Sequence, residues 1–155
     1  MPMAGPRGCS RSRRLRSRIE ARSFTIDGEA VVLGSDGLPR FDELRSREAA
    51  DTAMVYAFDL IEHDGEDLRD LPFLDRKAAL SRLLRNTEVG ILFNEHLAED
   101  GQTVFAHACQ LGVEGTVSKR VDGTYRSGPC RAWIKVRNPA SIAVQQRERS
   151  ENWNR

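Results

Sequence analysis

Met54–Ile61 reads MVYAFDLI, an apolar run of eight residues in which only Asp59 carries a charge. A short apolar run with β-branched and aromatic side chains is typical of a strand buried within a sheet. The polar segment His63–Glu66, HDGE, follows almost at once and predicts a turn. We therefore expect residues 54–61 to form a central strand, with neighbouring segments supplying the rest of the sheet.

Strand patterns occur on both sides of this run. Phe24–Asp27 and Glu29–Leu33 favour strand, with Gly28 between them. The segment Gly34–Gly37, GSDG, predicts a turn and suggests a hairpin. The remaining strands are expected at Val89–Asn94, Gly115–Arg120 and Ala132–Arg137.

Three segments favour helix. Phe41–Glu48 is short, whereas Leu74–Arg85 has Asp75 near its start and apolar side chains at helical spacing. Gly101–Leu111 has its apolar residues on one face, and Gly112 after it is a helix-stop signal. The apolar residues of the two longer helices are Ala79, Leu80, Leu83 and Leu84, and Val104, Phe105, Ala108 and Leu111.

The order of these segments predicts the fold class. Strands outnumber helices and do not alternate with them regularly, which indicates an α+β protein with mainly antiparallel sheets and flanking helices. A doubly wound parallel sheet is not expected. The chain contains neither GxxxxGK[ST] nor GxGxxG, so it has no glycine-rich phosphate loop of either kind.

The composition is that of an ordinary globular protein, with 39% hydrophobic and 30% charged residues. No apolar run approaches the roughly 20 residues of a membrane span. The N-terminus is basic but lacks the apolar core of a signal peptide. We therefore expect a cytoplasmic protein that does not associate with a membrane.

Charge is distributed unevenly along the chain. Residues 1–22 hold seven arginines and one glutamate, a net of +6, while the remaining residues carry 17 basic and 22 acidic side chains. We expect 1–22 to be a basic disordered tail, with an arm that touches phosphates as the alternative. The predicted body is 23–139, and 140–155 is a charged C-terminal tail.

Cysteine and histidine spacing argues against a structural metal. The three cysteines, Cys9, Cys109 and Cys130, form no CxxC, and the three histidines have no zinc-like spacing. Free thiols in a reducing compartment are expected.

Four segments are more informative than the composition. The chain contains DGEAVV at 27–32, YAFDL at 56–60, EGTVSKR at 114–120 and WIKVRNP at 133–139, with YRSG at 125–128. In this order and spacing they resemble the later motifs of ATP-dependent DNA ligases, especially the ligase domains of bacterial end-joining proteins. The resemblance covers roughly residues 23–155, and it implies that the body at 23–139 is a partial ligase adenylation domain.

The resemblance implies a reaction in three steps. A lysine amine attacks the α-phosphate of ATP, so that pyrophosphate leaves and lysyl-AMP forms. AMP then moves to the 5′-phosphate of nicked or broken DNA, and attack by the 3′-hydroxyl seals the strand with release of AMP. Roles in DNA repair and recombination, and ATP with Mg²⁺ or Mn²⁺ as cofactors, are implied.

Strand periodicity agrees with a site for phosphates in WIKVRNP. It places Trp133, Lys135 and Arg137 on one face, while Ile134 and Val136 face a core. A half-exposed strand without any site would show the same alternation. By resemblance, Lys135 and Arg137 bind ATP or AMP; the family usually has lysine where this chain has Arg137.

Other residues receive roles from the resemblance. Lys119 binds nucleotide, the Phe58 ring stacks on adenine, and Glu114 is a metal-side carboxylate. Glu29 is a carboxylate on the metal or ribose side, or alternatively an ordinary hairpin charge. An ideal strand would put Glu114 and Lys119 on opposite faces, so either Glu114 precedes the regular strand at Gly115 or the strand is bulged.

The nucleophile of the family is not evident in this chain. In the family it lies in a K-x-D-G motif upstream of DGE, whereas the only lysines here are Lys77, Lys119 and Lys135. An arginine cannot replace it, because a guanidinium stays protonated at working pH. The resemblance therefore implies an incomplete ligase-type nucleotidyltransferase domain, truncated on its N-terminal side and without a catalytic lysine.

Three functions remain open from the sequence. The first is a ligase-family chain that cannot adenylate itself, and the second is a non-catalytic remnant that binds nucleotide or DNA. The third is a domain completed by another polypeptide that supplies the N-terminal part.

Overall fold

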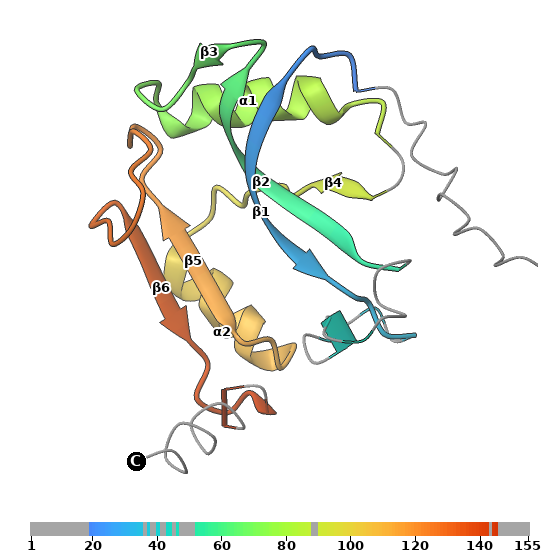
Figure 1. Ribbon diagram of the computed structural model, residues 1–155. Helices are drawn as coiled ribbons and strands as arrows, with labels where there is room; N and C mark the ends of the chain where they lie inside the picture. The colour runs from blue at the N-terminus through green and yellow to red at the C-terminus, as the bar shows by residue number, and fades with distance from the viewer. Residues whose placement is uncertain are drawn as a thin grey trace, which may run out of the picture. The chain divides into compact units, whose positions relative to one another are not determined.

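Figure 1 shows the computed structural model, which describes residues 19–35, 37, 40, 43–44, 46, 52–87, 90–142 and 144–145. The chain divides into two compact units. Unit 1 comprises the described residues within Met1–Leu68 and Lys77–Asn94, and unit 2 those within Arg69–Arg76 and Glu95–Arg155. The helix α1, Phe73–Leu84, contributes its first turn to unit 2 and the rest to unit 1.

The strand β2, Met54–His63, is the centre of the sheet in unit 1 (Figure 1). It pairs antiparallel with β1, Phe24–Val31, and with the two-residue strand β3, Glu66–Asp67. It pairs parallel with β4, Ile91–Phe93. The predicted central strand is confirmed, and the sheet is antiparallel except for the β2–β4 pair.

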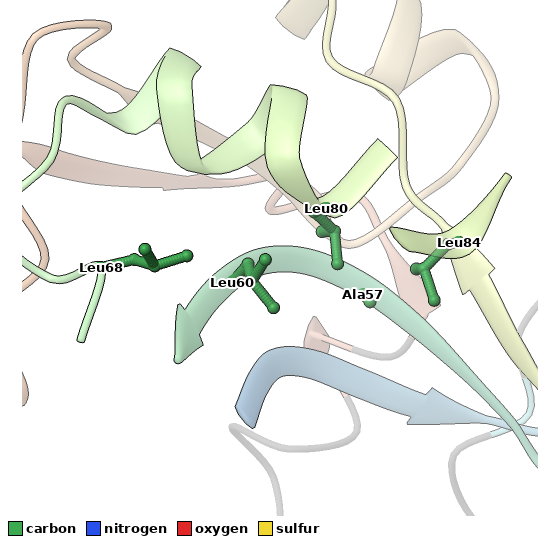
Figure 2. Close-up of a cluster of buried hydrophobic side chains, with 5 residues drawn as sticks. All are labelled: Ala57, Leu60, Leu68, Leu80 and Leu84. Atoms are coloured by element: carbon green, nitrogen blue, oxygen red, sulfur yellow. The ribbon is translucent and has the colours of Figure 1, made fainter. Parts of the chain in front are cut away.

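The core of unit 1 lies where α1 packs on β2. Figure 2 shows the five buried side chains, which come from β2, from the segment after β3 and from the helix. Burying one leucine contributes about 1.5–3 kcal/mol, so the four leucines of this cluster make a substantial contribution to stability. The helical spacing read from the sequence is confirmed. The five residues are Ala57, Leu60, Leu68, Leu80 and Leu84.

The pairing of β1 with β2 is interrupted twice by shifts of register. Asp27 pairs with Asp59 but Gly28 pairs with Ala57, so Phe58 is left opposite no residue. Gly28 does not separate two strands, as the sequence suggested, because β1 continues through it. A Cβ at Gly28 would lie 2.9 Å from the carbonyl oxygen of Tyr56, so only glycine allows this close approach.

The turn between β2 and β3 is the Asp64-Gly65 pair predicted from the sequence. Both residues have positive φ, 52° and 91°, as tight hairpin turns require. The Asp64 carboxylate accepts hydrogen bonds from the backbone N–H groups of Arg22 and Ser23, and Glu62 accepts from Gly65 N–H and the Ser23 hydroxyl. The two carboxylates therefore hydrogen-bond the residues just before β1 to the β2–β3 hairpin.

The same hydrogen bonds make this corner sensitive to acid. The backbone N–H of Gly65 lowers the pKa of Glu62 below its ordinary 4.5, and that of Arg22 lowers the pKa of Asp64 below its ordinary 3.8. A carboxyl whose pKa is lower in the folded state stabilises the fold above its unfolded pKa, and this contribution is lost as pH falls through the folded value.

We therefore expect the urea midpoint to be insensitive to these groups near pH 7, and to fall below about pH 4.5 as both carboxylates protonate. The matched variant is Asp64→Asn, which tolerates positive φ but does not titrate. Its midpoint should fall less steeply with acid. If the urea midpoints of the variant and the parent fell equally with pH, Asp64 would not be one of the groups that cause the loss of stability in acid.

Unit 2 contains a hairpin and a helix. The strands β5, Gly115–Lys119, and β6, Trp133–Arg137, pair antiparallel, and α2, Gly101–Gln110, contacts β5. The carboxylate of Asp100 caps α2 by accepting from Thr103 N–H at 3.0 Å. Gly112, with φ of 70°, follows the end of the helix as predicted.

Three apolar residues of unit 2 are more exposed than the sequence suggested. Leu111 is 71% exposed because α2 ends at Gln110, one residue earlier than expected. Ile134 is 60% and Val136 40% exposed, so the face opposite Trp133, Lys135 and Arg137 is not a closed core. The predicted alternation of faces along β6 was correct, but strand periodicity could not specify what covers Ile134 and Val136.

Several expectations concern residues near or outside the described ranges. The helix predicted at 41–48 falls mostly outside them, although Glu43 and Leu44 form a short 3₁₀ turn. The predicted N-terminal tail is described only from Ile19, whose side chain packs against the core cluster, so ordered structure begins before residue 23. Ser141 and Val144 are buried, so the described residues beyond 139 are not all exposed.

Neither long helix of the described residues has the length and hydropathy needed to cross a membrane.

Candidate functional site

The hairpin of unit 2 has one face rich in cations. Its register pairs Lys119 with Trp133, Val117 with Lys135 and Gly115 with Arg137, and residues paired directly across two strands share a face. Trp133, Lys135 and Arg137 therefore lie on one side, as predicted, and Lys119 joins them from β5. We call Lys119, Lys135 and Arg137 the cationic face.

Glu114 lies at the edge of this face. It precedes β5, so the first of the two predicted arrangements is correct and the strand is not bulged there. Its carboxylate is 3.4 Å from Lys135 Nζ, and its carbonyl oxygen accepts from the N–H of Asn138 at 2.7 Å. Asn138, only 1% exposed, also donates from its side chain to the carbonyl of Val113.

The Glu114–Lys135 ion pair is suited to exchange partners. The side chain of Lys135 is 52% exposed, and a pair with this much solvent contact contributes only about 0–1 kcal/mol. The pair can therefore separate at little cost in stability.

Lys119 is held differently, against aromatic rings. Its Nζ lies 3.9 Å from the centroid of the Trp133 ring and 5.1 Å from that of Phe73. Tyr125 packs edge-to-face on Trp133, with 5.7 Å between ring centroids. The buried guanidinium of Arg76 lies over both Phe73 and Tyr125. Phe73 and Arg76 were not predicted to belong to the site, because the helical pattern around them gives no indication of this clustering.

The loop between the two strands carries a further ion pair. Arg120 forms a two-pronged contact with Asp122, at 2.8 Å for the shorter bond, and the Arg120 hydrogen bonds lower the pKa of Asp122. Both side chains are more than half exposed, so this pair orders the start of the loop but contributes little to stability.

The remaining predicted site residues belong to unit 1. Glu29 is exposed on β1 opposite Tyr56, and Phe58 is half-buried at the irregularity in β2. The structure thus brings Glu114 and Lys135 together within unit 2, and it places Glu29 and Phe58 in the other unit.

Lys77 serves the fold of unit 1. It is 4% exposed, and its Nζ donates to the carbonyl oxygens of Phe58, at 3.2 Å, and of Asn94. The ring of Phe93 lies 4.8 Å away. The ammonium therefore joins α1 to β2 and to the end of β4, a role that its place in a helical pattern did not indicate.

A hollow of about 360 Å³ lies on the side of the hairpin opposite the cationic face. Thr116 and Ser118 line it from β5, Val136 from β6, and Asp100 and Phe105 from the α2 region. It contains none of the residues predicted to bind nucleotide.

The fold and this site define a class: an α+β protein in which an antiparallel hairpin carries Lys119, Lys135 and Arg137 on one face, with the Glu114 carboxylate at its edge. The sequence profile described as "ATP dependent DNA ligase domain" matches residues 10–137. The chain therefore belongs to the ATP-dependent DNA ligase family, as the motifs indicated.

Two relatives show the degree of similarity. The chain is 41% identical over 116 residues to the multifunctional non-homologous end joining protein LigD of Pseudomonas aeruginosa, covering 72% of this chain and 14% of that protein. It is 38% identical over 137 residues to a probable DNA ligase of Streptomyces griseus, covering 77% of this chain and 27% of that protein. The chain thus spans less than a third of either relative.

Solved structures agree with the fold. The crystal structure of the ligase domain of Mycobacterium tuberculosis LigD matches with a TM-score of 0.63 and 37% identity, over 74% of this chain and 37% of that one. A mycobacterial DNA ligase D complexed with ATP and MES matches equally well. The predicted α+β class is confirmed. The remnant without catalytic function is not favoured, since the relatives are named as ligases.

Proposed function

We propose that this chain forms part of the nucleotide-binding body of an ATP-dependent DNA ligase that acts on nicked or broken DNA in repair and recombination. The observation that carries the proposal is the cationic face, whose residues all lie within the range 10–137 that matches the ligase family. The similarity to a ligase structure complexed with ATP supports ATP as the nucleotide. A protein that acts on chromosomal DNA in bacteria works in the cytoplasm.

The chemistry of the cationic face fits a triphosphate. Lys119 and Lys135 are point charges, and Arg137 presents a planar fork of donors that matches phosphate oxygens. Together they offset the negative charge of a nucleotide and orient its phosphates. Phe58 is proposed to stack on adenine from unit 1, with its main chain held by Lys77.

A divalent metal fits only in part. No group of three or more metal-binding side chains assembles among the residues that the structure describes. Mg²⁺ is commonly bound by one or two carboxylates together with substrate phosphates, and Glu114 and Glu29 are proposed as those carboxylates. The metal would supply charge neutralisation at the phosphates, while Lys135 and Glu114 separate to receive them.

The nucleophilic lysine is proposed to come from outside these 155 residues. Each of the three lysines has another place: Lys77 holds backbone carbonyls, Lys119 lies against aromatic rings, and Lys135 pairs with Glu114. A second polypeptide, or another part of a longer protein, would then supply the K-x-D-G segment.

We expect no covalent AMP on this chain after incubation with α-labelled ATP and Mg²⁺ or Mn²⁺. Adding a separate polypeptide that carries the K-x-D-G segment should place label on that polypeptide. Lys135→Met in this chain should then reduce the label by roughly tenfold, since a phosphate contact is lost. The measurement is label retained after denaturing gel electrophoresis.

Two results would overturn the proposal. Label that survives denaturation on this chain would place the nucleophile within it. Failure of the wild-type chain to bind ATP in equilibrium dialysis, with the fold intact by circular dichroism, would remove the nucleotide site.

A further inference from the structure

Five residues of unit 2 form a closed circuit of cation–aromatic and aromatic contacts. The distances, centroid to centroid or cation to centroid, are 3.9 Å for Lys119–Trp133, 5.7 Å for Trp133–Tyr125, 5.9 Å for Tyr125–Arg76, 5.8 Å for Arg76–Phe73 and 5.1 Å for Phe73–Lys119. We call these five residues the cation–aromatic circuit. Each aromatic ring contacts two members of the circuit.

The circuit is anchored at its buried end. Arg76 is completely buried, and its guanidinium donates to the carbonyl of Leu71 and, at 3.2 Å, to that of Gly123. The N–H of Tyr125 donates to the carbonyl of Arg69 at 2.8 Å. The loop after β5 is therefore fixed to the first turn of α1, and this fixes the positions of Phe73 and Tyr125.

At its other end the circuit holds Lys119 of the cationic face. A lysine side chain has four rotatable bonds and loses much rotamer freedom when it binds a ligand. Ring faces attract an ammonium within about 6 Å, and indole does so most strongly. Trp133 and Phe73 therefore restrict Lys119 before any nucleotide arrives.

We propose that Trp133 and Phe73 are positioning residues for Lys119, fixing its ammonium in advance for a nucleotide phosphate. Trp133 belongs to the same strand as Lys135 and Arg137. One strand therefore carries two of the three cations and also the ring that restrains the third cation, Lys119. The role toward a nucleotide phosphate rests on the proposed function. The restraint of Lys119 by the two rings rests only on the distances between them.

The restraint can be observed without nucleotide. In protein labelled with ¹³C-lysine, the three lysines give three sets of side-chain resonances, which single Lys→Arg variants assign. The Lys119 Hε protons should be displaced upfield by the Trp133 ring current, relative to those of the exposed Lys135. Trp133→Leu should abolish most of the displacement, while Trp133→Phe should keep part of it and the Lys77 resonances should stay unchanged.

Nucleotide affinity tests whether the restraint of Lys119 strengthens phosphate binding. Trp133→Leu should weaken ATP binding roughly tenfold, while binding of adenosine, which has no phosphate, should change less than about twofold. Trp133→Phe should recover most of the ATP affinity. A merely structural role for Trp133 would weaken both ligands together.

The outcomes separate the two proposals. An undisplaced Lys119 resonance in the wild-type chain overturns the positioning role, whatever the binding data. A displaced resonance, together with ATP affinity that Trp133→Leu leaves unchanged, also overturns it. If Lys119 is displaced as expected but the wild-type chain binds no ATP, the restraint stands and the proposed nucleotide site fails.

Discussion

Replacing Lys77 with methionine should destabilise the protein by about 3 kcal/mol, because two carbonyl oxygens lose a charged donor that is itself buried. Lys77 is 4% exposed and donates to the carbonyls of Phe58 and Asn94. Methionine keeps the apolar stem and approximate volume, so the loss reports the ammonium and not a cavity. Urea unfolding followed by far-ultraviolet circular dichroism measures the effect.

The matched control is Lys135→Met, which removes an ammonium from a half-exposed ion pair. Its cost should stay within about 0.5 kcal/mol. Equal stability of Lys77→Met and the parent would show that the two carbonyls find other donors, and would contradict the role given to Lys77.

Gly115→Ala should cost about 3 kcal/mol or more, since an added Cβ would collide with the partner strand. That Cβ would lie 2.1 Å from the carbonyl oxygen of Val136 and 2.9 Å from Cα of Arg137. Both are backbone atoms, so neither can move aside without opening the hairpin. Because Arg137 is part of the cationic face, ATP affinity should fall together with the unfolding midpoint.

Gly101→Ala is the control for this substitution. Gly101 begins α2, and the only heavy atom near its added Cβ is Ser118 Oγ at 3.9 Å. The variant should be neutral or more stable by up to about 1 kcal/mol, because alanine favours helix. Equal unfolding midpoints for the two alanine variants would show that β5 and β6 do not approach as closely as the hairpin requires.

Particular segments show why much of the fold was predictable. MVYAFDLI lies at the centre of its sheet with every residue at least half-buried, and its apolar character reflects that position. The spacing of Leu80 and Leu84 matched their contact with β2, since a helix repeats its faces at short intervals. Asp64-Gly65 predicted its turn because few other residue pairs adopt positive φ without strain.

Particular residues of the site show where prediction from sequence stopped. Lys135 and Arg137 followed from alternation along a single strand, and the position of Glu114 remained between two arrangements until the strand start was known. The exposure of Ile134 and the register shift at Phe58 were not predicted, because both depend on what lies against the strand.

The chain sequence by itself determined the α+β class, the family and the absence of a lysine before the DGE segment, because these follow from local periodicity and ordered motifs. Only the tertiary structure decided that Lys77 holds two carbonyls and that Lys119 lies against Phe73 and Trp133. Phe73 and Lys119 are far apart in the chain, and their contact depends on how the loop after β5 meets the start of α1. Periodicity describes one element at a time, whereas a positioned cation depends on several elements packed together.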